Sequence, residues 1–211
     1  DLKQVARDKI ELPPGYILVW SGQYEFMERV KERLKIFVPL TLAIIFLLYY
    51  FTFRSVAETL MVMLGVPLSL VGGIWALYWL NYNMSIAVWV GLIALAGVAA
   101  ETSAIMLSYL DGAVKRRREC GQLNSLDDLL ETVKSGAMER IRPVMMTGLA
   151  NIVGLMPVML ATGVGADVMK RLAAPMIGGV GSALLLTLFV IPAIYVIWRW
   201  HTDIKYLADK T

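Results

Sequence analysis

SIAVWVGLIALAGVAAETSAIMLSYL, residues 85–110, is an uncharged run interrupted by one acidic side chain, Glu101. A helix of this length, at about 1.5 Å per residue, crosses the roughly 30 Å of hydrocarbon in a bilayer. An ionisable side chain inside a membrane span is energetically costly, and it usually marks an ion or proton pathway. The run therefore predicts a membrane helix, and Glu101 predicts a transport function.

The whole chain has the composition of a membrane protein. Hydrophobic residues make up 58% of its 211 residues, and the mean hydropathy is +0.63, above what a soluble domain keeps away from water. The net charge of +3 does not indicate a nucleic-acid partner, because the basic residues cluster beside apolar runs and act as topology signals. The one cysteine, Cys120, has no second cysteine for a disulfide, so we expect a reduced thiol.

Five apolar runs are long enough to span a lipid bilayer, which predicts an all-α membrane protein with five transmembrane helices. The predicted spans cover about 36–53, 59–80, 85–110, 143–166 and 172–198. Buried helices of a large soluble protein imitate one such run, but not five in series. Four prolines within the spans predict kinks or local unwinding: Pro39, Pro67, Pro157 and Pro192.

The remaining segments predict the domain organisation. Residues 1–35 combine a predicted strand at Tyr16–Trp20 with an amphipathic helix from Glu25, which predicts the α/β edge of a translocated domain. Residues 36–199 form the predicted transmembrane region, and residues 200–211 form a tail. The chain begins with Asp1 and not with methionine, so we expect a piece of a longer polypeptide.

The charge of the loops predicts the orientation of the spans. Seven basic side chains lie between residues 111 and 142, whereas the connection at 163–171 holds only Lys170 and Arg171. Positively charged loops stay in the cytoplasm, which predicts a cytoplasmic C-terminus and an N-terminal segment on the outer side. Ser125 and Asp128 form a capping-box pattern that predicts a loop helix over about 125–140. We interpret it as a helix packed on the bundle along the membrane face, with a regulatory target as the alternative.

Small residues share the predicted helical face of Glu101. They recur at spacings of three and four and let a neighbouring backbone approach closely, so we expect Glu101 to face protein near mid-membrane. A desolvated carboxylate favours its protonated form unless a cation or hydrogen-bond donors compensate, which suits a proton carrier. The alternative is a permanently protonated group that joins two helices by hydrogen bonds. The small residues are Ala87, Gly91, Ala94, Gly97, Ala104 and Ser108.

The later spans supply further candidate site residues. Thr147 and Asn151 are four residues apart on the fourth span, which predicts a polar helix face and a proton-relay role, with interhelical hydrogen bonding as the alternative. Methionine sulfur is a soft ligand for Cu(I) and Ag(I), although most of the twelve methionines are expected to be apolar filler. Met169 and Met176, seven apart at the outer end of the fifth span, are the candidate metal ligands.

Several segments resemble the heavy-metal efflux branch of the resistance-nodulation-division (RND) transporters. The likeness extends over nearly the whole chain and is greatest to copper and silver pumps of the CusA and SilA type. It implies the end of the second periplasmic porter domain followed by membrane helices eight to twelve. It also implies a cation:proton antiporter, not an enzyme, with a metal ion as cargo and no resident cofactor. The segments are Ser21–Glu25, Gly97–Glu101, Arg140–Pro143 and Val168–Gly179.

The resemblance implies partners and one relay residue. It implies a homotrimer in the Gram-negative inner membrane, joined by a periplasmic adaptor and an outer-membrane channel. Glu101 matches a glutamate that is thought to form a proton relay with a carboxylate on the fourth helix. Val144 departs from the copper and silver pattern, which has a lysine there, and is similar to the cobalt, zinc and cadmium branch. A pump of that class or for organic compounds is therefore an alternative, and a non-transporting membrane scaffold is another.

Overall fold

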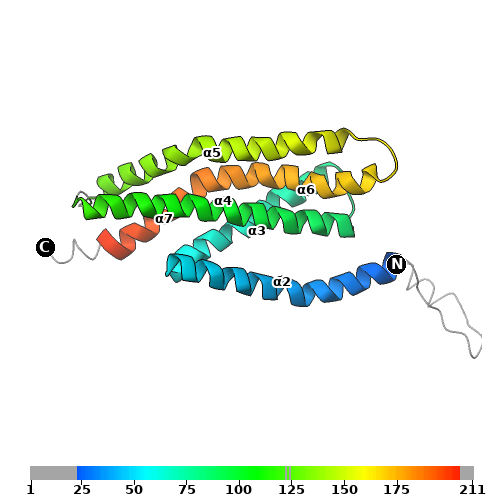
Figure 1. The fold of residues 1–211 in the computed structure, drawn as a ribbon, viewed down its shortest axis with the longest axis horizontal. Helices are drawn as coiled ribbons and strands as arrows, with labels where there is room; N and C mark the ends of the chain where they lie inside the picture. Colours follow the sequence, from blue (N-terminus) through cyan, green and yellow to red (C-terminus); the bar gives the residue numbers. More distant parts are fainter. Residues whose placement is uncertain (1–22, 122, 124, 205–211) are drawn as a thin grey trace, which may run out of the picture. The chain divides into compact units, whose positions relative to one another are not determined.

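The computed structural model describes residues 23–121, 123 and 125–204, and the regular structure of this part is helical throughout (Figure 1). Five helical segments in it are long and apolar enough to cross a membrane. The prediction of five membrane helices is therefore confirmed. The predicted strand at Tyr16–Trp20 lies outside the described residues. The five segments are Glu28–Phe53, Val56–Trp79, Ile86–Glu119, Leu126–Leu160 and Ala166–Thr202.

The chain divides into two compact units, Asp1–Pro39 and Leu40–Thr211. The described part of the first unit is the first half of helix α2 (Gln23–Phe53), whose exposed Arg29 and Glu25 form an ion pair at 3.0 Å. The boundary falls at the proline inside α2, and proline removes one hydrogen bond of a helix. All features described below belong to the second unit.

Three helices in the second unit start at serine caps. The hydroxyls of Ser55, Ser85 and Ser125 accept hydrogen bonds from backbone N–H groups three residues later, which satisfies donors that the first turn leaves without a partner. The predicted capping box is confirmed, because the Ser125 backbone also donates to the Asp128 carboxylate at 3.0 Å. These caps begin α3 (Val56–Trp79), α4 (Ile86–Glu119) and α5 (Leu126–Leu160).

The helix predicted over about 125–140 is present and packs on the bundle, but it is not separate from the span that follows it. The helix expected over about 125–140 and the span expected from residue 143 are one continuous helix, α5, of 35 residues. Leu129 and Val133 near its start are buried in the same cluster as Leu110 and Val114 of α4. This packing continues along α5, so the helix persists through Pro143 instead of turning to lie on the membrane face as a separate element.

The last membrane segment is interrupted, although the sequence predicts a single span over 172–198. It consists of α6 (Ala166–Leu185), a π-helical segment η1 (Leu186–Val190), α7 (Ile191–Arg199) and a second π-helical segment η2 (Trp200–Ile204). The local distortion expected at Pro192 is present, because η1 lies directly before it. The helices continue through Pro39, Pro67 and Pro157.

Helix α6 packs against α3, α4 and α5 and forms the centre of the second unit (Figure 1). It approaches α3 closely, since a Cβ atom at Gly72 would lie 2.9 Å from the Gly178 carbonyl oxygen. Nearby, the Ser182 hydroxyl donates to the Ser69 carbonyl at 3.2 Å. Small residues and an interhelical hydrogen bond of this kind let membrane helices pack without a hydrophobic driving force, so α3 and α6 form a tightly joined pair.

Candidate functional site

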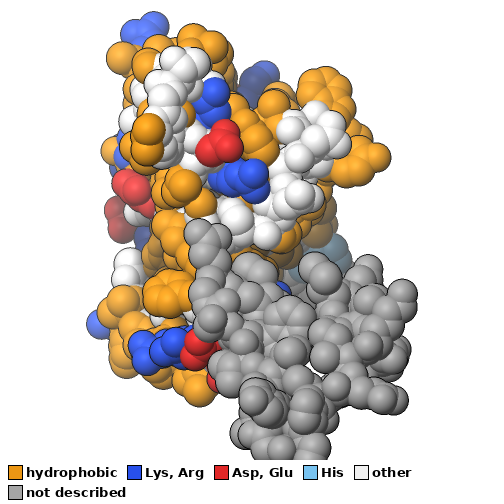
Figure 2. Space-filling model, turned by 90° about the vertical axis from the view of Figure 1, so that its right-hand side faces the viewer, with side chains coloured by type: hydrophobic (Ala, Val, Ile, Leu, Met, Phe, Trp, Pro, Cys, Tyr) orange, Lys and Arg blue, Asp and Glu red, His pale blue; other side chains and the backbone are white. Residues whose placement is uncertain are grey.

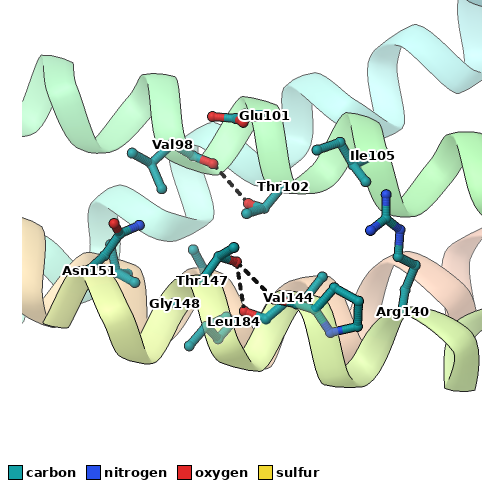
Figure 3. A pocket seen from close by; sticks show the side chains of 13 residues that line it. Val98, Glu101, Thr102, Ile105, Arg140, Val144, Thr147, Gly148, Asn151 and Leu184 are labelled. Atoms are coloured by element: carbon teal, nitrogen blue, oxygen red, sulfur yellow. Dashed lines mark hydrogen bonds between the residues drawn. The ribbon is translucent and has the colours of Figure 1, made fainter. Parts of the chain in front are cut away.

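A cavity of about 360 Å³ is lined by α4, α5 and α6 and brings the predicted proton-relay residues together. Glu101 and Thr102 come from α4, and Thr147 and Asn151 come from α5, as Figure 3 shows. Arg140 of α5 also lines it. The cavity therefore places one carboxylate, one guanidinium, two hydroxyls and an amide at a single space in the membrane region. The other lining residues are Val98, Ile105, Pro143, Val144, Gly148, Val180, Ala183 and Leu184.

The polar groups of α5 share the cavity because of helical spacing. Arg140, Thr147 and Asn151 are seven and four residues apart, which places them on one face of a helix. Gly148 sets how closely α5 approaches α6, since a Cβ atom there would lie 2.8 Å from Cγ of Leu184. The missing side chain lets Leu184 close the apolar wall opposite the polar groups.

Both threonine hydroxyls are donors to their own helices. Thr102 Oγ1 donates to the Val98 carbonyl at 2.9 Å, with the Ala99 carbonyl at 3.1 Å as a second acceptor. Thr147 Oγ1 lies 3.1 Å from the carbonyls of both Pro143 and Val144. With its proton so directed, each hydroxyl oxygen is left as an acceptor. The threonines can therefore receive a proton donor in the cavity, such as a protonated carboxyl group or a water molecule.

Glu101 lines the cavity from its edge (Figure 3). The side chain is exposed and makes no hydrogen bond or ion pair with the described residues. Figure 3 shows it at the edge of the cavity and not directed at Thr147. Gly91 does pack on α6, where a Cβ atom would lie 2.8 Å from Cγ of Pro175, but nothing lies within 4 Å of one at Gly97.

The helical period explains why Gly91 packs on α6 and Gly97 does not, although both belong to the predicted face of small residues around Glu101. Ten residues are not a whole number of turns, so Gly91 lies about 80° around the helix from Glu101. The part of this face near the start of α4 therefore packs on α6 at Gly91, while Ala94, Gly97 and Ser108 are exposed like Glu101. Glu101 stands on a different face of α4 from Gly91, at the edge of the cavity (Figure 3).

Arg140 is a site residue that sequence reasoning missed, because it was counted among the topology signals. Its guanidinium lies over the Tyr109 ring at 3.8 Å from the ring centroid. Its Nε is buried with no hydrogen-bond acceptor among the described residues. Its spacing of two turns from Thr147 indicates that both residues share one helix face. This spacing applies only because α5 continues through Pro143. Arg140 thus gives the cavity a cation.

The two candidate metal ligands lie on α6, away from the cavity. Met169 is 55% exposed near the start of α6, and Met176 is partly buried two turns later, about 10.5 Å along the helix axis. Figure 2 views the end of the second unit at which α6 begins, where hydrophobic side chains lie beside a few charged ones. Among the described residues, no group of three or more His, Cys, Asp or Glu side chains could hold a metal ion.

A bundle of helices long enough to cross a membrane, with a carboxylate and a guanidinium lining one cavity, is typical of membrane transporters. The model of the AcrB/AcrD/AcrF family matches residues 1–199. The chain belongs to this family and to its RND heavy-metal efflux branch. The resemblance found in the sequence is confirmed. Family and helices together indicate a multi-pass inner-membrane protein.

Individual relatives agree with this assignment. The cation efflux system protein CusA of Escherichia coli O157:H7 is 46% identical over 203 residues, 95% of this chain and 19% of that protein. The cobalt-zinc-cadmium resistance protein CzcA of Cupriavidus metallidurans is 39% identical over 92% of the chain and 18% of that protein. A crystal structure of a heavy metal efflux pump matches with a TM-score of 0.75 at 34% identity, covering 92% of this chain and 18% of that one. The chain thus spans about a fifth of the length of these relatives, which are efflux transporters and not enzymes.

Proposed function

We propose that this chain is part of a proton-driven pump that exports heavy-metal cations, with Cu(I) and Ag(I) as the favoured cargo. The observation that carries the proposal is the cavity between α4, α5 and α6, where Glu101 and Arg140 line the same space. A carboxylate that exchanges a proton and a fixed cation nearby form a pair whose net charge changes by one unit in each transport cycle. The metal ion is cargo, and no resident cofactor is proposed.

The cavity residues suggest how the proton acts. When Glu101 is ionised, the guanidinium of Arg140 offsets its charge across the cavity. When Glu101 is protonated, this charge is absent, and Arg140 retains its contact with the Tyr109 ring, which stabilises a cation in a poorly hydrated place. The two protonation states therefore favour different packing of α4 and α5, and this difference can drive the periplasmic part through its access states.

The choice of metal rests on the relatives and on methionine chemistry. The identity of 46% to CusA exceeds the 39% to CzcA, and the copper and silver branch is the one that the sequence resembles most. Met169, exposed at the outer end of α6, is proposed to receive a soft ion, and Met176 to receive it next, because their spacing favours sequential contact. Val144 supports a cobalt, zinc or cadmium pump as the second candidate.

The assembly and orientation are proposed on the same basis. We place the N-terminal segment in the periplasm and the C-terminus in the cytoplasm, following the basic residues in the last turns of α4 and the first half of α5. Large apolar side chains such as Trp75 and Phe189, 66% and 70% exposed, are suited to lipid or to other parts of a homotrimer. A periplasmic adaptor and an outer-membrane channel complete the proposed pump.

Replacement of Glu101 tests the proton role. In the complete pump, Glu101→Gln keeps the shape of the side chain and removes its exchangeable proton, so we expect normal membrane insertion but no protection of a sensitive host against copper or silver. Proton flux into vesicles in response to the metal gradient is expected to disappear as well. Glu119→Gln, at the exposed end of the same helix, is the matched control and is expected to protect normally.

The same assay distinguishes the alternatives. Unchanged metal tolerance and proton flux in Glu101→Gln would remove the proton role and favour a scaffold. The unmodified pump could instead protect against cobalt, zinc and cadmium, or against organic dyes, and not against copper and silver. In that case the proposed cargo would be wrong, but the proposed proton mechanism would stand.

A further inference from the structure

A second group of charged side chains is buried at the opposite end of the bundle from the start of α6. Arg199 Nη2 donates to Asp111 Oδ1 at 2.7 Å and lies 3.5 Å from Glu58 Oε1. Glu58 and Asp111 are only 4% and 8% exposed. We call Glu58, Asp111 and Arg199 the charged triad. It joins α3, α4 and α7, which are distant in sequence.

Neighbouring groups hold the triad in place. Arg199 Nε donates to the Tyr195 hydroxyl at 3.1 Å, and this hydroxyl donates to Asp111 Oδ1 at 3.4 Å. Lys115 Nζ lies 2.6 Å from the other Asp111 oxygen. The planar guanidinium offers several donors in a fixed fork, which is the property needed to contact a carboxylate and a hydroxyl at once.

Stability alone does not account for a buried group of this kind. Desolvation of the charges offsets much of their attraction, and buried ion pairs can often be replaced by apolar side chains without loss of stability. Removal of one partner is costly only because it leaves the remaining charge buried. The retained charges therefore point to a role in fixing one particular arrangement of the three helices.

The triad lies where the last membrane segment can move independently. α6 is tightly joined to α3 by the Gly72 and Gly178 contact, but α7 follows the π-helical segment η1 and has Pro192 in its first turn. π-helical turns are local departures from the α-helical ladder and are frequent at functional sites. The position of α7 relative to α6 is thus adjustable at η1, and Arg199 at its end fixes it to α4.

Asp111 connects this end to the cavity. It lies on α4, the helix that carries Glu101, about 15 Å further along the axis, and α4 is unbroken between them. A displacement of α4 that begins at Glu101 therefore reaches Asp111 as a rigid-body movement.

We propose that the charged triad consists of positioning residues that make α7 follow α4 during the proton cycle. The inference rests on the proposed proton function of Glu101. Arg199 transmits the displacement of α4 to α7 through Asp111, while Glu58 supplies the anchor on α3. The bend needed for this movement occurs at η1.

A neutral version of the triad separates positioning from folding. In the complete pump, the triple variant Glu58→Gln, Asp111→Asn, Arg199→Met leaves none of the three charges buried alone, so we expect it to insert and fold. We expect its metal-coupled proton flux to fall by roughly tenfold, within the usual range of coupling between sites. Normal flux in this folded variant would overturn the proposal.

A distance measurement tests the movement itself. Spin labels at Cys120, the exposed C-cap of α4, and at a cysteine replacing the exposed Thr202 of η2 report the distance between α4 and the end of the last segment. We expect the same narrow distribution with Glu101 and with Glu101→Gln, because the helices move together, and a broader one in the triple variant. An unchanged distribution in the triple variant would contradict the proposal.

Arg199→Lys and Glu101→Gln, each compared with the triple variant, separate a failure of the triad proposal from a failure of the proposed proton function. Arg199→Lys retains the charge but loses the fork, and we expect flux between those of the original and the triple variant. If the triple variant does not fold, full flux in Arg199→Lys would still overturn the proposal. Full flux in Glu101→Gln would refute the proposed function itself, whereas lost flux there with full flux in the triple variant would refute only the role of the triad.

Discussion

Glu101 and Asp111 are carboxylates on the same helix, α4, but their surroundings differ. Glu101 is exposed at the edge of a cavity and has no hydrogen bond or ion pair with the described residues. Asp111 is buried and contacts Arg199, Tyr195 and Lys115. A carboxylate without a fixed partner can exchange a proton with little disturbance, whereas one held by three neighbours fixes the helices that carry them. One helix thus combines a site suited to chemistry with a site suited to attachment.

The largest expected effect comes from removing one partner at the attachment site. Arg199→Met leaves Glu58 and Asp111 buried without the guanidinium, and we expect a loss of about 3–5 kcal/mol in the free energy of unfolding. Glu101→Gln should cost little by comparison, because no described partner is lost. Denaturant unfolding of the complete pump in detergent measures both. Equal losses would break the comparison between the two carboxylates.

An intermediate effect is expected at the cavity wall. A methyl group at Gly148 would press on Leu184, whose Cγ would be 2.8 Å away, whereas nothing lies within 4 Å at Gly97. We expect Gly148→Ala to cost about 1–3 kcal/mol by overpacking and to reduce transport by narrowing the cavity. Gly97→Ala is the matched control and should be tolerated. Thermal unfolding and metal-tolerance assays measure the two effects. Equal behaviour of Gly148→Ala and Gly97→Ala would contradict the expected overpacking at the cavity wall.

The smallest effect is expected for an ion pair on the surface. Arg117 and Glu131 join α4 to α5 at 3.1 Å, with 34% and 70% of their side chains exposed. Because exposed pairs are screened by water and salt, Arg117→Gln should cost less than about 1 kcal/mol. A cost similar to that of Arg199→Met, measured in the same unfolding experiment, would show that burial is not what distinguishes the charged triad.

Several features could be predicted from the sequence because they depend on local pattern. The five membrane helices follow from the length of the apolar runs, and the capping box at Ser125 follows from residues three positions apart. Thr147 and Asn151 reach the same cavity as Glu101, as their spacing on one helix face suggested. The family resemblance, carried by short motifs, was confirmed by the comparisons.

Only the tertiary structure decided which faces are covered and which distant charges meet. The spacing of small residues around Glu101 shows that a neighbour can approach, but α6 packs on Gly91 and leaves Glu101 at the edge of the cavity. Arg140 becomes a cavity residue because α5 continues through Pro143. Arg199 meets Asp111 across 88 positions of sequence. Helical periodicity relates residues within a few turns, whereas contacts between helices depend on packing along their whole length, which local pattern does not encode.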